Sequence, residues 1–172
     1  IGNNIVTNSI KIGNNMPNNV ILTGPNAGGK STFIKSISIS LLFAQTFGIA
    51  FADELELTPF SFMNTHLNIP DCKGKESLFE AEMHRARDHL SKLENLDKKE
   101  FSYVVMDEIF SSTNPEEGIS GAYAIAEKLS NNKNSIALIT THFSYLTKLE
   151  NTNKFKNYKI PISRDNDNNI IY

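Results

Sequence analysis

The chain has 172 residues, of which 40% are hydrophobic and 21% are charged, as is typical of one globular domain with a buried core. Its formal net charge of −2 provides no general electrostatic attraction to nucleic acid, so any DNA contact would need a local patch or another part of a larger protein. A single cysteine, Cys72, excludes an internal disulfide and a multi-cysteine zinc site. Because no signal peptide and no membrane-spanning stretch is recognisable, we expect a soluble intracellular protein without a membrane contact.

The two ends of the chain indicate a fragment. The chain starts at Ile1 without a methionine and stops at Tyr172 within the apolar run NIIY. We therefore expect one domain over residues 1–172 that is taken from a longer protein.

The first predicted elements surround a glycine-rich loop. An extended segment over residues 5–12 and the turn GNNMPNN lead to a strand over residues 19–23. A helix is predicted over residues 29–46, and Gly48 ends it. The apolar residues that recur at helical spacing on its inner face are Phe33, Ile34, Ile37, Leu41 and Ala44.

The middle of the chain alternates strands with a long amphipathic helix. The stretch TPFSFMNTHL, residues 58–67, predicts a strand, and residues 77–96 predict a helix. The inner face of this helix is expected to carry Leu78, Phe79, Met83, Leu90 and Leu93. The run FSYVVM then predicts a buried strand that ends at the carboxylates of Asp107 and Glu108.

The last third repeats the alternation. Pro115 is suited to the first turn of a helix that runs to Leu129, and the apolar run SIALITTH predicts another buried strand. The segments YKIPI and NIIY are expected to form edge strands. The pattern predicts an α/β fold with a mainly parallel central sheet, helices on both faces and antiparallel edge strands at the termini.

The glycine-rich loop, TGPNAGGKST, carries a phosphate-binding pattern. Gly24, Gly29, Lys30 and Ser31 fit G-x-x-x-x-G-K-[ST], in which backbone N–H groups surround phosphate oxygens, the lysine reaches the β- and γ-phosphates and the hydroxyl is a Mg²⁺ ligand. The following helix adds the positive end of its dipole. The alternative is a glycine-rich turn with an exposed lysine. We expect nucleotide binding.

An acidic pair and a histidine end the next two buried strands. A metal-bound nucleoside triphosphate requires a carboxylate near Mg²⁺ and a group that orients the attacking water. We assign Asp107 to the Mg²⁺ and Glu108, at the bend after the strand, to the water. His142 would lie beside the γ-phosphate, because the carboxyl ends of parallel strands line the ligand crevice. The alternatives are a solvated acidic pair and a structural histidine.

Together, GPNAGGKST, VVMDEI with the following SSTNPEEG, and ITTH before FSYL resemble the ATPase domain of the MutS family of DNA mismatch-repair proteins. The motifs occur in the family's order and at approximately its spacing. The resemblance implies a P-loop NTPase fold of the ABC-ATPase type, with ATP or ADP and Mg²⁺ as ligands and with Ser31 and Asp107 at the metal. The loop residues expected to bind the nucleotide are Gly24, Pro25, Asn26, Ala27, Gly28, Gly29, Lys30, Ser31 and Thr32.

The resemblance also implies a composite site between two subunits. The stretch SLFEAEM is similar to the family's S-T-F-M-x-E-M, whose serine, here Ser77, reaches the γ-phosphate held by the other subunit. Ser77 is otherwise simply the N-cap of its helix. Upstream, Ile5 or Val6 stands where many family members have an aromatic residue that stacks on adenine. The partners implied are a second MutS-like subunit, identical or different, and mismatched or branched DNA, bound by domains outside this segment.

Departures from the family pattern indicate a divergent branch. The family's G-R-G-T after the acidic pair is here Phe110, Ser111, Ser112 and Thr113, so the arginine is missing. The family's dimerisation element would follow Tyr172. The first functional hypothesis is an ATP-hydrolysing domain of a dimeric mismatch-repair or DNA-structure-recognition protein. The alternatives are a nucleotide-gated interaction module with little hydrolysis and a MutS-like protein that acts outside mismatch repair.

Overall fold

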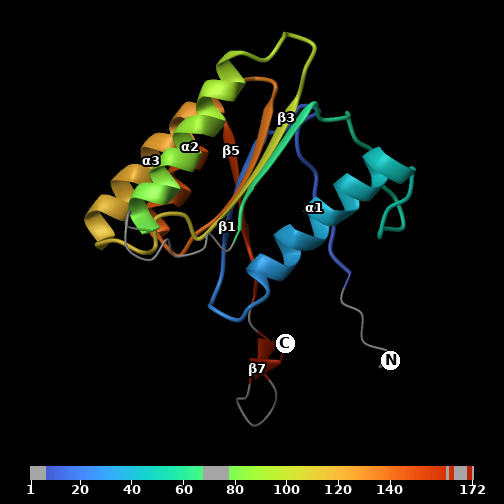
Figure 1. Ribbon diagram of the computed structural model, residues 1–172. Coiled ribbons are helices and arrows are strands. Elements are labelled where there is room, and N and C mark those ends of the chain that lie inside the picture. The colour runs from blue at the N-terminus through green and yellow to red at the C-terminus, as the bar shows by residue number, and fades with distance from the viewer. Residues whose placement is uncertain (1–6, 68–77, 162, 165–169, 172) are drawn as a thin grey trace.

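A computed structural model of the chain describes residues 7–67, 78–161, 163–164 and 170–171 (Figure 1). Its main sheet has five strands in the order β2–β3–β4–β1–β5, and every neighbouring pair is parallel. The predicted α/β class with a parallel sheet is therefore confirmed. In chain order the elements are β1 (Asn19–Thr23), α1 (Lys30–Phe47), β2 (Phe62–His66), α2 (Leu78–Glu94), β3 (Ser102–Asp107), α3 (Pro115–Ser130), β4 (Ser135–Thr140), the 3₁₀ helix η1 (Ser144–Thr152), β5 (Phe155–Lys159), β6 (Ser163–Arg164) and β7 (Ile170–Ile171).

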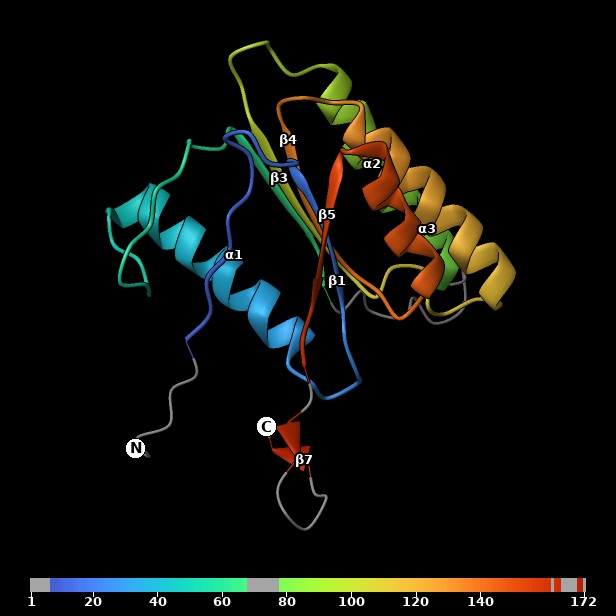
Figure 2. The same cartoon turned by 180° about the vertical axis from the view of Figure 1, so that it is seen from behind.

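Helices cover both faces of the main sheet. Helix α1 lies on one face, and α2 and α3 lie side by side on the other, as the two opposite views show (Figures 1 and 2). A hydrophobic core lies on each face of the sheet, and successive residues of a strand point into opposite cores. On β3, Tyr103 and Val105 face α1, whereas Val104 and Met106 face α2 and α3. The strands are apolar on both faces because both are covered. None of the helices in the described part of the chain is long and apolar enough to cross a membrane.

Helix α1 agrees closely with its prediction. It begins after Gly29, which has φ of 92°, and ends at Gly48, whose φ of 71° places it in the left-handed region that glycine adopts without steric cost. The Gly48 N–H donates to the Ala44 carbonyl at 3.0 Å. Ile34 and Leu41 are buried, as expected from the helical spacing.

Helix α2 presents only part of the predicted face to the core. Met83 is 37% exposed, while Glu82 and His89 are buried on the inner side. Leu93 is buried, and Phe79 and Leu90 pack against the core, as predicted. The prediction was wrong for Met83, and it missed Glu82 and His89 because it considered apolar residues alone. His89 is held by a stacked contact with Phe62 of β2, at 5.1 Å between ring centroids.

The predicted antiparallel edge strands at the termini are wrong. Edge strand β5 runs parallel to β1, because η1 returns the chain to the end of the sheet from which β1 also starts. Strands β6 and β7 pair only with each other, in a separate antiparallel sheet. Residues 7–12 form no strand; Ile10 and Ile12 pack instead against the core beneath α1.

Candidate nucleotide-binding site

The predicted phosphate loop and the acidic pair lie together at the carboxyl ends of the central strands of the main sheet. The phosphate loop leaves the carboxyl end of β1, the acidic pair follows β3, and Thr140 ends β4. Strand β4 lies between the other two and pairs Thr140 with Leu22 on one side and with Asp107 on the other. Ligands of parallel α/β sheets bind outside the carboxyl ends of the strands, and the loop and the acidic pair lie at such a position.

The loop between β1 and α1 is held by its own backbone. The Gly28 N–H donates to the Pro25 carbonyl at 3.1 Å. A Cβ atom on Gly28 would lie 2.9 Å from Pro25 Cγ and 3.0 Å from the Pro25 oxygen, so the turn requires glycine there. Ala27 and Gly29 have φ of 62° and 92°. No side chain caps the start of α1, so its first N–H groups remain available to an anion.

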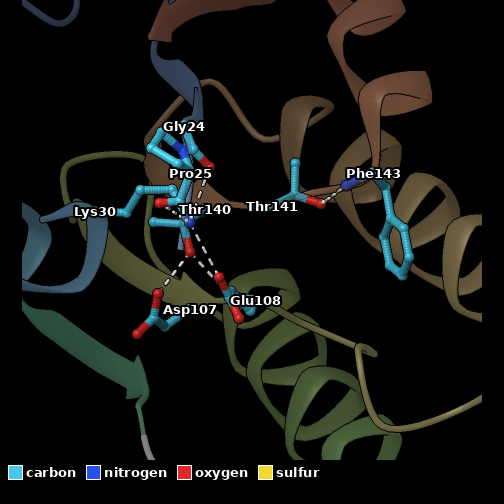
Figure 3. A network of polar contacts seen from close by, with 8 residues as sticks. All are labelled: Gly24, Pro25, Lys30, Asp107, Glu108, Thr140, Thr141 and Phe143. Atoms are coloured by element: carbon cyan, nitrogen blue, oxygen red, sulfur yellow. Dashed lines mark hydrogen bonds and ion pairs between the residues drawn. The ribbon is translucent and has the colours of Figure 1, made fainter. Parts of the chain in front are cut away.

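Lys30 is buried inside this loop, and only 3% of its side chain is exposed. Its Nζ donates to the carbonyl oxygens of Gly24 and Pro25, each at 3.1 Å, and forms an ion pair with Glu108 Oε1 at 3.1 Å (Figure 3). The ammonium therefore uses all three of its donors within the protein. The alternative of a glycine-rich turn with an exposed lysine is wrong.

The acidic pair bends around Thr140. Thr140 Oγ1 donates to Asp107 Oδ1 at 2.6 Å and accepts from the Glu108 N–H at 2.9 Å (Figure 3). Glu108 has φ of 50°, so the chain turns at this residue, as the sequence predicted. Because of this turn, both carboxylates lie at the carboxyl ends of the strands: Asp107 contacts Thr140 of β4, and Glu108 contacts Lys30. Thr140 was not among the predicted site residues, although its place at the end of an apolar strand is a signal that could have identified it.

The loop and Glu108 border a hollow of about 330 Å³. Its lining consists of Pro25, Asn26, Ala27, Gly29, Lys30, Ser31, Thr32 and Glu108, all of them predicted site residues. A second hollow, of about 720 Å³, shares Pro25 and is bounded by Gly24 and by the end of β5 at Lys159, Ile160 and Pro161. Sequence reasoning missed this contribution of β5, because only the sheet order brings β5 beside β1.

His142 does not line the hollow formed by the phosphate loop and Glu108. It follows β4, its side chain is exposed, and it is not among the described residues that line either hollow. Its ring packs on Phe143, at 4.4 Å between centroids. The neighbouring Thr141 anchors the segment: its N–H donates to the Leu22 carbonyl at 3.1 Å, and its Oγ1 accepts from the Phe143 N–H at 2.9 Å. The other predicted contacts, Ser77, Ile5 and Val6, lie outside the described residues.

The comparison with known protein families decides the assignment. Residues 20–172 match the family model of MutS domain V. The chain belongs to the MutS family. The resemblance inferred from the motifs is thereby confirmed.

Several MutS relatives align with nearly the whole chain. It is 32% identical over 175 residues to the DNA mismatch repair protein MutS of Desulforapulum autotrophicum, covering 99% of this chain and 19% of that protein. Against MutS of Thermotoga sp. the identity is 32% over 170 residues, covering 98% and 21%, respectively. For MutS of Treponema pallidum (strain Nichols) it is 30% over 158 residues, covering 91% and 17%. The chain thus spans about a fifth of the length of these MutS proteins.

The structure also shows what occupies the position of the MutS pattern G-R-G-T. Phe110 stands at the expected position of the first glycine; it has a φ of 60°, and the residue is fully buried. Ser112 stands at the second glycine, and its hydroxyl donates to Glu82 of α2 at 3.2 Å. The departure of this MutS-family chain from the pattern is therefore accommodated by contacts of its own.

Proposed function

We propose that this chain is the ATPase domain of a MutS-like protein and that it binds and hydrolyses Mg²⁺-ATP. The observation that carries the proposal is the ion pair between Lys30 and Glu108, which joins the phosphate loop to the acidic pair above one hollow. The names of the relatives support a role in DNA mismatch repair for the larger protein. Recognition of mismatched or branched DNA would then fall to parts of that protein outside this chain.

The donor atoms around the hollow fit a magnesium nucleotide. Mg²⁺ prefers oxygen ligands and is usually held by one or two carboxylates together with substrate phosphates. Ser31 lines the hollow and provides a hydroxyl, and Asp107, the residue before Glu108, provides a carboxylate beside Thr140. In the described segments no cluster of three or more His, Cys, Asp or Glu residues offers a separate metal site. When bound, Mg²⁺ would neutralise charge that develops on the phosphate oxygens.

The chain's own groups have distinct tasks in this proposal. The ammonium of Lys30 and the N–H groups of residues 26–31 hold the phosphates, with the start of α1 adding its dipole. Because Lys30 has only three donors, a triphosphate competes with Glu108 for the same ammonium. Phosphate binding thus releases the Glu108 carboxylate, which then orients a water and accepts its proton. His142 and the nucleotide-clamping Ile5 or Val6 complete the proposed site.

Hydrolysis is proposed to take place in a site shared by two subunits, with Ser77 of one subunit reaching the γ-phosphate held by the other. Ser77 lies outside the described residues and is followed in the sequence by Leu78, the first described residue of α2; a serine hydroxyl at a helix N-terminus, together with free N–H groups, would favour an anion. The competing function is a nucleotide-gated dimerisation module with little hydrolysis. The observation that favours it is the altered segment that begins at Phe110, since this segment starts two residues after the proposed catalytic Glu108.

The proposal is tested by measuring Mg²⁺-ATP hydrolysis per subunit over a wide range of protein concentration. Glu108→Gln should lower turnover by about 10²- to 10⁴-fold, the contribution of a positioned general base. ATP affinity should be unchanged or higher, because a negative charge near the phosphates is removed. Lys30→Met should abolish ATP binding, and Glu150→Gln, at an exposed ion pair of η1, is the matched control for loss of a carboxylate.

The outcomes separate the hypotheses. Specific activity that rises with concentration and falls in Ser77→Ala supports a shared site. Activity that is independent of concentration and insensitive to Ser77→Ala contradicts it. Tight ATP binding without Mg²⁺-dependent phosphate release favours the nucleotide-gated module, whereas undiminished turnover in Glu108→Gln removes the role assigned to this carboxylate.

A further inference from the structure

Phe110 is a buried aromatic residue in a backbone conformation that non-glycine residues rarely adopt. It lies two residues after Glu108 and is fully buried with φ of 60°, and Glu108 itself has φ of 50°. Two positive φ values so close together at non-glycine residues persist only where the surrounding structure determines them. The contacts of Phe110 therefore bear on the conformation of Glu108.

The first turns of α2 supply two of these contacts. The ring of Phe79 packs edge-on against the ring of Phe110, at 5.2 Å between centroids. One turn further along α2, the Glu82 carboxylate accepts from the Ser112 hydroxyl at 3.2 Å and from the Phe110 N–H. Glu82 is only 7% exposed; its burial raises the pKa of the carboxyl, while the two hydrogen bonds oppose that rise.

Helix α3 closes the other side of Phe110. A Cβ atom on Gly118 would lie 2.5 Å from the Phe110 carbonyl oxygen and 3.0 Å from the Phe143 ring. A Cβ atom on Gly121 would lie 3.1 Å from the Phe110 ring. The two glycines leave the space that Phe110 fills, so the loop cannot move toward α3. A movement of α2 would open the opposite side of Phe110, where Phe79 packs against it.

We infer that Phe79, Glu82, Phe110 and Ser112 form a clamp that makes the position of α2 set the backbone conformation of Glu108. Phe110 and Glu82 are the positioning residues of this clamp. A displacement of the first turns of α2 would be transmitted through the Phe79–Phe110 contact and the Glu82 hydrogen bonds to the turn at Glu108. The backbone turn at Glu108 then determines how the Glu108 carboxylate reaches Lys30.

The consequence for catalysis rests on the proposed function. If Glu108 orients water, the clamp makes its alignment depend on the position of the first described turns of α2, the part of the helix nearest in sequence to Ser77, which is proposed to reach a second subunit. Approach of that subunit would then alter the alignment of Glu108 without touching it.

The first test measures amide hydrogen exchange of the full chain by NMR and does not depend on ATPase activity. The reporter is the Glu108 N–H, which donates to the Thr140 carbonyl at 3.1 Å and to its Oγ1 at 2.9 Å. Phe79→Ala and the volume-conserving Glu82→Gln should each accelerate its exchange at least about tenfold more than they accelerate exchange of β4 amides. The control is Leu93→Ala, at a buried residue of the same helix about 21 Å from Phe79 along the helix axis. This substitution should accelerate exchange of the Glu108 amide and of the β4 amides to a similar extent.

The second test measures hydrolysis in the same variants. The two clamp variants should lower kcat about tenfold or more with KM for ATP within about twofold, while Leu93→Ala leaves kcat near the value of the unchanged chain. Absence of hydrolysis in the unchanged chain would remove the proposed function, and the exchange experiment would then decide the clamp by itself. Exchange at Glu108 that responds to Phe79→Ala and Glu82→Gln no more than to Leu93→Ala would overturn the inference.

Discussion

Replacement of Gly118 by alanine is a direct test of how tightly the loop after Glu108 is packed. Gly118 lies at the end of the first turn of α3, where the added Cβ atom would lie 2.5 Å from the Phe110 carbonyl oxygen and 3.0 and 3.3 Å from two atoms of the Phe143 ring. Contacts below 3.0 Å to a backbone atom cannot be relieved by a change of rotamer, so the turn at Phe110 or the start of α3 must shift.

The expected magnitude follows from two opposing terms. Gly→Ala within a helix is worth about 1 kcal/mol in favour of alanine, whereas overpacking of a filled core costs about 1–3 kcal/mol. We expect the upper half of that cost here, because the obstacle is a carbonyl oxygen in a turn already held at positive φ. The net loss should be about 1–2 kcal/mol, or a fall in Tm of about 2–8 °C for a domain of this size.

Thermal unfolding followed by circular dichroism, together with urea titration, checks this value, and Gly121→Ala is the matched control. Its Cβ atom would lie 3.1 and 3.2 Å from two atoms of the Phe110 ring, which is a side chain and can move by a few tenths of an ångström. With the same gain in helix propensity, Gly121→Ala should stay within about 0.5 kcal/mol of the unchanged protein. A Gly118→Ala protein as stable as the Gly121→Ala protein would refute the view that the Phe110 turn is immobile.

Three further predictions concern stability. Burial lowers the pKa values of His66 and His89 to about 4 from 6.5, so below pH 6.5 the unfolded chain binds protons that the folded chain does not bind. The free energy of unfolding should therefore be highest above pH 6.5 and should fall as the pH drops toward 4. Urea midpoints at pH 7.0, 6.0 and 5.0 should show this decline, and the double substitution His66→Phe/His89→Phe should reduce it. Asn114→Ala removes the N-cap of α3, whose Oδ1 accepts from the Glu117 N–H at 3.0 Å, and should cost about 1 kcal/mol in urea unfolding; an unchanged midpoint would contradict the cap. Thr140→Val leaves the Glu108 N–H without its side-chain acceptor and should cost about 1–3 kcal/mol, in contrast to the exposed substitution Thr147→Val, which should have little effect.

Much of the architecture could be predicted from the sequence because its signals are local. The spacing of Ile34 and Leu41, with Gly48 beyond them, was sufficient to locate α1, since helix periodicity and a left-handed C-cap depend on neighbours in the chain. Pro115 marked the start of α3 for the same reason. The apolar runs that became β3 and β4 indicated a parallel sheet covered on both faces.

The sequence alone did not determine which polar residues would be buried or where the tail would pair. Glu82 and His89 lie on the inner face of α2 because Ser112 and Phe62, remote in the sequence, provide their contacts. The direction of β5 depended on where η1 placed the chain, which no local pattern encodes.

The residue types of the candidate site were thus determined by the sequence: a loop of glycines with Lys30 and Ser31, and the carboxylates of Asp107 and Glu108 after a buried strand. Only the tertiary structure decided that Lys30 would be buried against Glu108, that Thr140 would join the two carboxylates, and that Phe110 would fill the space beside Gly118. The physical reason is the sheet order, which inserts β4 between β1 and β3 and so brings into contact groups that are separated along the chain by dozens of residues.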